Sequence, residues 1–409
     1  MQNEGLDVHA GQAVAGLLVR SDLAPDTTLF QYRPDCAPKY AVSLTMPVVR
    51  DPYDAMSGLL PIFDMNLPEG ALREELRRAF SKSVRDFDDL ALLSIVGQSQ
   101  IGRLRFSPKG ATPAAVPTVD VDSLLTTRGT KALFAELFAR YASASGISGA
   151  QPKILLRNAS AAGPIDRMTA KSATHIVKAF DERRFPELAA NEYFCMLAAH
   201  HAGLPTPNVR LSDDRQILVV ERFDIAADGS YLGFEDLCVL HGVRAHGKYD
   251  ASYEQIARYV STYVSPRHQR DTMEQFFLNL ALSCALRNGD AHLKNFGVVY
   301  ADCTQEVRFA PAYDITSTVP YLANDTLALT LDGSKAFPDA KRLKLFGRTH
   351  CGLPVGRVRQ LLAQATVGIE QAISAIRKFA RKHKDFVPMA ERLEGTFRAG
   401  MVMSFGAKR

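Results

Sequence analysis

The stretch RNGDAHLKNFGVVY (287–300), together with RFAPAYDITS (308–317), decides the fold that the sequence predicts. The apolar run before it has helical periodicity and ends where Asn and Gly begin a polar loop. Two strand-like runs follow, and a polar turn separates them. This order predicts a buried helix, a short polar loop and a hairpin, with acidic and amide side chains in the loop and an acid after the hairpin.

The loop carries Asp290 and Asn295 in the spacing D-x-x-x-x-N, and Asp314 follows the hairpin. In protein kinases, the aspartate of this spacing accepts the proton of the substrate hydroxyl and the asparagine holds Mg²⁺. Magnesium requires several oxygen ligands, so a second acid has to reach it, and Asp314 is the candidate. The three residues predict phosphoryl transfer, although the spacing alone also occurs in ordinary turns.

Basic residues near these acids are candidates for a nucleotide site. His292 and Lys294 either contact phosphates or adenine or are solvated loop residues. Lys178 lies in the strand-like run THIVKAF, where an unpaired buried ammonium is costly, so we expect it to meet phosphates and a carboxylate. Glu192, in the next helix-like run, is the candidate carboxylate. The alternative is a surface lysine and a solvated glutamate.

Two further segments suit a nucleotide site, and each has a plainer explanation. ISGAQPKILL (147–156) places a small-residue turn before a strand, where backbone N–H groups can approach phosphates, but an ordinary turn fits the same pattern. VVERFD (219–224) ends a strand before a polar connection, as a kinase hinge does when it offers backbone groups to adenine. Any strand that leaves a sheet can look the same.

The chain has 409 residues, of which 46% are hydrophobic and 23% charged, a balance typical of globular proteins. Its six cysteines form no CxxC pair and have no histidine at zinc-site spacing, which argues against a disulfide framework and a structural metal. The longest apolar run is far shorter than the roughly 20 residues of a membrane-spanning helix, and the N-terminal residues lack a signal-peptide pattern. We expect a cytoplasmic protein without a membrane partner. The net charge of +5 could favour contact with nucleic acid or an acidic partner, but an excess of this size more often serves only solubility.

Four parts are predicted along the chain. Residues 1–110 form an N-terminal α+β subdomain, and residues 111–135, rich in Pro, Ala and Thr, form a linker or covering segment. Residues 136–225 form an N-lobe in which strands surround one helix, and residues 226–409 form a helical C-lobe.

Individual elements follow from the same patterns. Strand-like runs are AVAGLLV (13–19), YAVSLTM (40–46), KILLR (153–157), THIVKAF (174–180) and ILVVERF (217–223). Helices are expected from Pro68, over 129–142, and from Phe185 to near Gly203. Beyond residue 250, one helix face is expected to carry Met273, Phe276, Phe277, Leu280 and Cys284.

Taken together, these segments resemble HipA, the kinase family of HipA–HipB toxin–antitoxin systems, over residues from about 10 to about 340. The segments that carry the resemblance are NLPEGALR (66–73), SGAQPK (148–153), HIVK (175–178), ERFD (221–224), FEDLC (234–238), NGDAHLKN (288–295) and APAYD (310–314). The resemblance implies a two-lobed, protein-kinase-related fold of the α+β class, with a β-containing N-terminal subdomain and an all-α C-lobe. It implies ATP and Mg²⁺ as cofactors.

The resemblance also assigns roles to residues. The catalytic residues would be Asp290 as the base, with Lys178 and Asn295, and the metal ligands would be Asn295 and Asp314. The residues that bind ATP would be Gly149, Ala150, Gln151 and Lys153 of a phosphate-covering loop, Lys178, Glu221 and Phe223 of the hinge, and His292, Lys294 and Tyr313.

Members of this family phosphorylate aminoacyl-tRNA synthetases, arrest translation and favour persistence. A helix-turn-helix protein, HipB, restrains them on operator DNA, so the resemblance implies a HipB-like partner. In members of the family the segment before GAQ often reads S-x-S or S-x-A, and its serine is an autophosphorylation site. Here Gly146 occupies the first position of that pattern and Ser148 the last, so Ser148 is the candidate site. The glutamine common after FEDLC is Val239, a departure that touches the nucleotide pocket.

Two other functions fit parts of the sequence. A small-molecule kinase of the aminoglycoside phosphotransferase type shares the loop spacing and the later acid, but SGAQPK and NLPEGALR argue against it. A catalytically idle corepressor would act by binding HipB and DNA, and the basic run AIRKFARKHK (375–384) would suit DNA phosphates. The alternative for that run is a solvated helix face with Ile376 and Phe379 packed inward.

Overall fold

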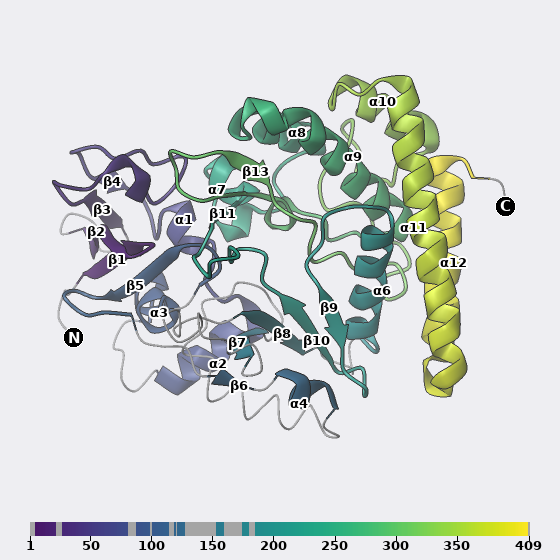
Figure 1. Cartoon of the computed structure of the whole chain (residues 1–409), viewed down its shortest axis with the longest axis horizontal. Coiled ribbons are helices and arrows are strands. Elements are labelled where there is room, and N and C mark those ends of the chain that lie inside the picture. The colour runs from purple at the N-terminus through teal and green to yellow at the C-terminus, as the bar shows by residue number, and fades with distance from the viewer. Residues whose placement is uncertain are drawn as a thin grey trace. The chain divides into compact units, whose positions relative to one another are not determined.

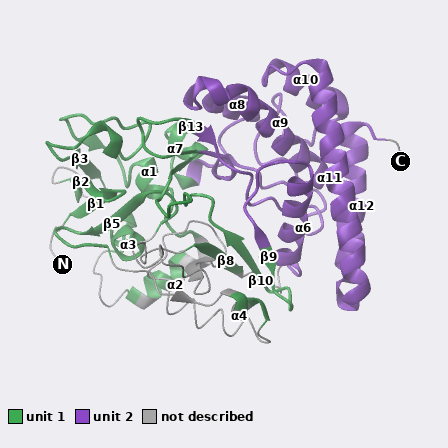
Figure 2. Cartoon of the chain, viewed as in Figure 1, with its two compact units in different colours: residues 1–180, 210–245, 299–307 green, residues 181–209, 246–298, 308–409 purple. Residues whose placement is uncertain are grey.

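The computed structural model describes residues 5–21, 27–80, 87–98, 100–113, 118–119, 121–126, 153–158, 174–179 and 185–407. The chain divides into two compact units, coloured separately in Figure 2. Unit 1 comprises residues 1–180, 210–245 and 299–307, and unit 2 comprises residues 181–209, 246–298 and 308–409. The α+β class predicted from the sequence is confirmed (Figure 1).

An antiparallel sheet with the order β4-β3-β2-β1-β5 opens unit 1. Its strands are β1 (Leu6–Ala10), β2 (Ala13–Arg20), β3 (Thr28–Tyr32), β4 (Tyr53–Asp54) and β5 (Leu104–Pro108). The following helices are α1 (Pro61–Asp64), α2 (Gly70–Phe80) and α3 (Asp89–Val96). Phe63 of α1 meets Phe30 and Phe106 of the sheet edge-on, with ring centroids 5.2 and 5.6 Å away, which joins helix and sheet in one core. The helix predicted from Pro68 is α2, which begins two residues later.

The run YAVSLTM, predicted as a strand, does not form one. Its first residue ends a 3-10 turn, η1 (Pro38–Tyr40), and the rest is a loop closed by an isolated bridge between Ser43 and Met46. The hydroxyl of Tyr32 donates to the carbonyl of Met46 at 2.5 Å and accepts the N–H of Val42 at 2.9 Å. The apolar alternation was therefore misleading, because a tyrosine of β3 satisfies the backbone groups that a strand partner would otherwise pair.

A second sheet has the order β6-β7-β8-β10-β9. Its strands are β6 (Thr118–Val119), β7 (Lys153–Asn158), β8 (His175–Ala179), β9 (Val209–Leu211) and β10 (Ile217–Glu221), and a short helix, α4 (Val121–Thr126), follows β6. The strands predicted at KILLR, THIVKAF and ILVVERF are confirmed. Strand β8 is central and antiparallel to both neighbours, which places Lys178 opposite Leu218 and Lys153.

The part predicted as an all-α C-lobe contains strands as well. A three-stranded sheet with the order β11-β12-β13 is formed by β11 (Gly233–Asp236), β12 (Gly297–Tyr300) and β13 (Val307–Phe309). The all-α description is corrected in this respect, since the β-branched hairpin runs pair with each other and β12 also pairs with the segment before α7 (Leu237–His241).

Unit 2 is built mainly of helices: α6 (Leu188–His201), α8 (Tyr253–Tyr263), α9 (Gln269–Leu286), α10 (Ala340–Thr349), α11 (Val355–Lys382) and α12 (Val387–Phe405). Short 3-10 turns are η4 (Ala245–Gly247), η5 (Pro266–His268), η6 (Leu293–Asn295) and η7 (Lys384–Phe386). In Figure 1 the long helices α11 and α12 lie side by side, with α6 beside α11. The helix predicted around Phe276 is α9, but every residue from Phe276 to Leu286 is buried, so this half is enclosed on all sides rather than on one face.

The basic end of α11 has its apolar side chains turned inward. Ile376 is fully buried, and the ring of Phe379 meets that of Phe194 at 5.5 Å. Arg377 and Lys378 are exposed. This matches the solvated helix face that the sequence offered as the alternative to DNA contact.

All six cysteines are free thiols. Cys195, Cys238, Cys284 and Cys351 are buried, and Cys36 and Cys303 are half-buried. In the described ranges no helix is both long enough and apolar enough to span a bilayer. Within the same ranges, no three or more His, Cys, Asp or Glu side chains cluster as metal ligands would.

Candidate active site

The loop that carries Asp290 begins at the C-terminal end of α9. Arg287 adopts a left-handed conformation (φ 59°, ψ 49°), which ends the helix. At Gly289 a Cβ would lie 2.6 Å from the main-chain oxygen of Thr326, so the close approach requires glycine. The side-chain oxygen of Asn288 accepts the N–H of Asp290 at 3.0 Å. The helix end and this turn together set the direction in which the Asp290 side chain leaves the backbone.

Asp290 presents an accessible carboxylate with one engaged oxygen. Its side chain is 57% exposed, and Oδ1 accepts the hydroxyl of Tyr249 at 2.8 Å. Nε2 of His292 lies 3.8 Å from the same oxygen. The carboxylate is therefore open to a substrate and held at one of its two oxygens.

Asn295, the second residue of the D-x-x-x-x-N spacing, closes the loop. It ends the 3-10 turn η6 and is 7% exposed. Its side-chain oxygen accepts the N–H of His292 at 3.0 Å. An amide oxygen has two lone pairs, so this contact leaves one for a cation.

Asp314 lies on the segment after the hairpin, and a hydrogen bond ties that segment to the loop. The hydroxyl of Tyr313 donates to the carbonyl of Lys294 at 2.7 Å. Asp314 itself is half-buried and adopts a left-handed conformation (φ 59°), which Asp tolerates better than most residues. The structure thus brings the two parts of the predicted site together within unit 2.

Burial and four charged neighbours act on the pKa of His292. Burial lowers the pKa of the His292 imidazole below its usual 6.5, and this effect outweighs the negative charges of Asp290 and Asp314, which raise it. Lys248 and Lys294 lower the same pKa. Two acids and two lysines therefore act on one neutral imidazole.

Two side chains clamp the segment after Asp314. Asn191 of α6 donates to the carbonyl of Ser317 at 2.8 Å and accepts its N–H at 3.0 Å. The hydroxyl of Thr318 accepts the N–H of Gly289 at 2.9 Å and donates to the carbonyl of Arg287 at 3.1 Å. The backbone that carries Asp314 is thus joined both to α6 and to the loop of Asp290.

Three of the predicted nucleotide-binding residues with described side chains lie in unit 1. Lys178 on β8 is 5% exposed, and Glu221 is exposed at the end of β10. Phe223 meets the ring of Phe234 edge-on at 5.5 Å. Glu192, the carboxylate proposed for Lys178, is 2% exposed on α6 of unit 2. The pairing of Lys178 with Glu192 stays a prediction.

The remaining predicted residues fall on parts of the chain without described side chains. Ser148, Gly149, Ala150 and Gln151 lie outside the described residues, as does the helix expected over 129–142. For Lys153 the structure gives the backbone of β7 alone. Their roles in ATP binding and autophosphorylation stay predictions.

The motif ERFD contains a buried ion pair that sequence reasoning did not single out. Arg222 binds both carboxylate oxygens of Asp224, and both residues are almost completely buried. Asp224 also accepts the N–H of Gly102 at 2.6 Å, and Arg222 donates to the carbonyl of Gln100 at 3.0 Å. Arg222 and Asp224 therefore hold residues 100–102 against the strand end, a structural role within unit 1.

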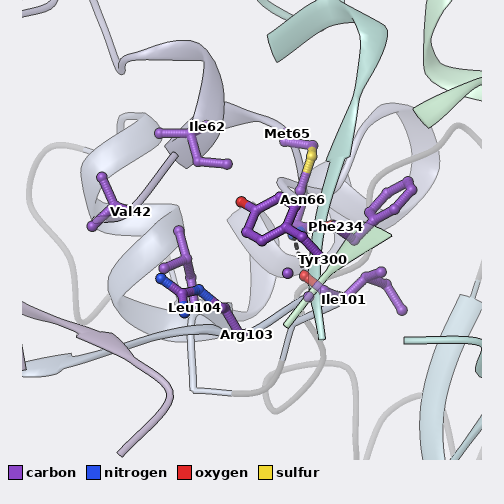
Figure 3. Close-up of a pocket in the computed structure, with 11 residues that line it drawn as sticks. Val42, Ile62, Met65, Asn66, Ile101, Arg103, Leu104, Phe234 and Tyr300 are labelled. Atoms are coloured by element: carbon purple, nitrogen blue, oxygen red, sulfur yellow. Dashed lines mark hydrogen bonds between the residues drawn. The ribbon is translucent and has the colours of Figure 1, made fainter. Parts of the chain in front are cut away.

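A small pocket lies inside unit 1, and Ile101 and Gly102 are among its lining residues (Figure 3). Met65, Asn66, Phe234 and Tyr300 are among its lining residues, and its volume of about 10 Å³ admits roughly one water molecule. Beside it, the buried carboxyl of Glu235 accepts a hydrogen bond from the Tyr300 hydroxyl, and burial raises the pKa of Glu235. The pocket contains none of the predicted site residues and is too small for a nucleotide.

Sequence reasoning missed Tyr249, Asn191 and Thr318. Tyr249 lies in the segment HGKYD, where nothing in spacing or composition links it to Asp290. Asn191 directly precedes Glu192, and Thr318 directly follows the quoted stretch, so only their nearness to predicted residues could have drawn attention to them.

Family models match two parts of the chain. A model described as the HipA N-terminal domain matches residues 6–107, and one described as a HipA-like C-terminal domain matches residues 145–376. Two proteins of Sinorhizobium fredii, “Putative kinase Y4dM” and “Putative kinase Y4mE”, are 27% and 30% identical over 67% and 68% of this chain. The matches cover 66% and 69% of those two proteins.

The fold has a close counterpart among solved structures. HipA of Shewanella oneidensis MR-1, solved with HipB and operator DNA, aligns with a TM-score of 0.69 over 99% of this chain and 100% of that one. The sequence identity is 19%, so the likeness concerns the fold. The two-lobed, kinase-related fold expected from the sequence motifs is thereby confirmed.

Proposed function

The chain belongs to the HipA family, and on that premise we propose that it is a serine/threonine protein kinase that uses ATP and Mg²⁺. We propose further that it acts as the toxin of a HipA–HipB-like toxin–antitoxin pair. The names of the two Sinorhizobium relatives support the kinase part of this proposal.

One observation carries the catalytic part. The hydrogen bond from the Tyr313 hydroxyl to the Lys294 carbonyl, at 2.7 Å, joins the loop of Asp290 and Asn295 to the segment of Asp314. Phosphoryl transfer to a hydroxyl needs a base on one side and oxygen ligands for a cation on the other. The described part of unit 2 supplies such groups at this junction.

In the proposed step, the hydroxyl oxygen of a serine or threonine forms a bond to the γ-phosphorus of ATP. The bond between that phosphorus and the bridging oxygen breaks, and ADP leaves. The hydroxyl proton passes to the carboxylate of Asp290, whose 57% exposure gives an acceptor access to it. His292 stays neutral near neutral pH, because burial lowers its pKa, and so adds no positive charge beside the base.

Asn295 and Asp314 fit the requirements of Mg²⁺. One is an amide with a free lone pair on its oxygen, and the other is a half-buried carboxylate held by an ordered backbone. Magnesium binds proteins through one or two such oxygens and completes its shell with water and phosphates. When bound, it neutralises charge on the phosphates.

The test of the kinase proposal compares three proteins in assays with labelled ATP and Mg²⁺. Wild type is expected to transfer the γ-phosphate to itself, to added protein or to water, and Asp290→Asn to lose about 100-fold or more of that rate while ATP binding persists. Asp271→Asn is the matched control, because this acid of α9 is exposed and lies outside the site. An Asp290→Asn protein as active as wild type would overturn the assigned role.

The toxin proposal is tested in cells. Induction of the wild type is expected to arrest growth, induction of Asp290→Asn is not, and a small helix-turn-helix protein encoded beside the gene is expected to relieve the arrest. The solved complex of Shewanella HipA with HipB and operator DNA supports such a partner and its operator. Equal toxicity of wild type and Asp290→Asn would mean that phosphoryl transfer is not the cause.

We propose an aminoacyl-tRNA synthetase as the substrate, on the strength of the family resemblance. Phosphoproteomics after brief induction without antitoxin identifies which serine or threonine gains phosphate. The same experiment tests Ser148 as an autophosphorylation site, because phosphate found only at other serines of the chain would exclude it.

A further inference from the structure

The two oxygens of the Asp290 carboxylate have different surroundings. Oδ1 accepts the Tyr249 hydroxyl at 2.8 Å and lies 3.8 Å from Nε2 of His292. Oδ2 has no hydrogen-bond partner in the part of the chain that the structure describes. One oxygen is held and the other is open, on a side chain that is 57% exposed.

Tyr249 is itself fixed against the loop that it contacts. Its ring meets the imidazole of His292 edge-on, with centroids 5.1 Å apart and planes at 76°. The preceding carbonyl, that of Lys248, accepts the N–H of Leu293 at 3.2 Å. Main-chain and side-chain contacts therefore dock this segment on the loop of Asp290, although Tyr249 is 41% exposed.

An exposed carboxylate without such contacts rotates freely about its last bond. A hydrogen bond to one oxygen restricts that rotation, and it is worth about 1 kcal/mol or more when the acceptor is charged. Because proton transfer requires the base within hydrogen-bond reach of the acceptor hydroxyl, a restricted carboxylate spends more time in the reactive geometry.

We propose that Tyr249 is a positioning residue for the base: its hydroxyl holds Oδ1 of Asp290, so that Oδ2 accepts the proton of the substrate hydroxyl. This inference rests on the proposed role of Asp290. It concerns a residue outside every motif quoted from the sequence.

Tyr249→Phe keeps the ring and its contact with His292 and removes the hydroxyl alone. We expect kcat for γ-phosphate transfer to fall about tenfold, the equivalent of about 1.4 kcal/mol, while KM for ATP changes less than about twofold. Tyr193→Phe is the matched control, since that tyrosine is a half-buried residue of unit 2 whose hydroxyl has no partner among the described residues. It is expected to match wild type.

Tyr249→Leu removes the ring as well as the hydroxyl, so comparing it with Tyr249→Phe distinguishes the effect of the hydroxyl from that of the ring. If the hydroxyl orients the base, the Leu and Phe variants lose similar amounts of kcat. If Tyr249→Phe is as active as wild type and only Tyr249→Leu is impaired, the ring serves packing and the inference is overturned. Thermal unfolding of each variant shows whether a loss of rate comes from loss of folded protein.

Two other results would also overturn the inference. A higher rate in Tyr249→Phe would mean that the hydroxyl blocks the base, and phosphate on Tyr249 in the active wild type would mean that it is an acceptor. Asp290→Asn, assayed in parallel, distinguishes this failure from the failure of the proposed function. An inactive Asp290→Asn beside an unaffected Tyr249→Phe removes the positioning role alone, whereas a fully active Asp290→Asn removes the base itself.

Discussion

Asn191 forms two hydrogen bonds with the main chain of Ser317, one to its carbonyl at 2.8 Å and one from its N–H at 3.0 Å. The amide imitates a neighbouring strand, and it does so from a fully buried position on α6. Ser317 lies three residues after Asp314, so the helix fixes the backbone on which the proposed metal ligand stands.

Replacing Asn191 with alanine leaves two buried main-chain groups unpaired. Each such group costs about 1–3 kcal/mol, so we expect Asn191→Ala to lower the free energy of unfolding by about 2–4 kcal/mol. Urea unfolding measures the change, and Gln371→Ala, an exposed helix position, serves as the control. If Asn191→Ala unfolds at the same urea concentration as Gln371→Ala, the hydrogen bonds between Asn191 and Ser317 contribute nothing to the free energy of unfolding.

Asp314→Asn should weaken magnesium binding without unfolding the protein. Asparagine tolerates the left-handed backbone of this position, but it lacks the charge of a carboxylate. We expect the Mg²⁺ concentration at half-maximal rate to rise by about tenfold or more, which is about 1.4 kcal/mol of binding free energy. Asp332→Asn is the matched control, because it is the same substitution at an exposed residue that also has positive φ. It should leave the Mg²⁺ concentration at half-maximal rate unchanged.

The neutral His292 should make the folded protein sensitive to acid. Burial lowers its pKa below 6.5, so the unfolded chain binds a proton here at higher pH than the folded protein. Stability is therefore lost as pH falls below about 6.5, by up to about 1.4 kcal/mol per pH unit, until the folded-state pKa is passed.

His292→Asn removes this contribution and should lose less stability than wild type between about pH 7.5 and about pH 5.5. Urea midpoints at the two pH values measure the difference, with exposed His201→Asn as control. His9, His175 and His241, whose pKa values partial or full burial also lowers, stay in both proteins and cancel in the comparison. Equal losses in His292→Asn and wild type would contradict the assignment of a buried neutral imidazole.

Two glycines of α12 should respond in opposite ways to alanine. A Cβ at Gly400 would lie 1.8 Å from the carbonyl oxygen of Ala285 on α9, whereas a Cβ at Gly395 would meet nothing within 4 Å. We expect Gly400→Ala to cost about 1–3 kcal/mol or more, because the two helices have to move apart. Gly395→Ala should raise stability by up to about 1 kcal/mol through helix propensity. Similar thermal midpoints for the two variants would contradict the close packing of α12 on α9.

The parts of the fold that the sequence predicted correctly are those in which local pattern and tertiary contacts agree. The strand of Lys178 and the helix of Glu192 follow from alternation and from helical periodicity, and both exist close to their expected bounds. The run YAVSLTM has the same alternation, yet the hydroxyl of Tyr32 takes up its backbone groups and no strand forms. A contact between residues distant in sequence decided that segment, and the alternation itself contains no sign of it.

The site shows the same division. The spacing of Asp290 and Asn295 is a property of one loop, so the sequence could predict it, and the later Asp314 followed from the need for a second acid. Tyr249 is separated from Asp290 by about forty residues and by two helices, α8 and α9. Its contact arises only when those helices fold back on the loop, and no short-range pattern encodes it.

The burial of the cysteines gives the protein a built-in reporter of opening. Burial raises the pKa of the Cys284 and Cys351 thiols to about 12, so in the folded protein these groups are both shielded and protonated, and alkylating reagents react with thiolates. Both belong to unit 2, whereas buried Cys238 belongs to unit 1. The rate at which each thiol becomes labelled therefore measures how often its own unit opens, without any introduced probe. Nucleotide added during such an experiment would slow the labelling of whichever unit it stabilises.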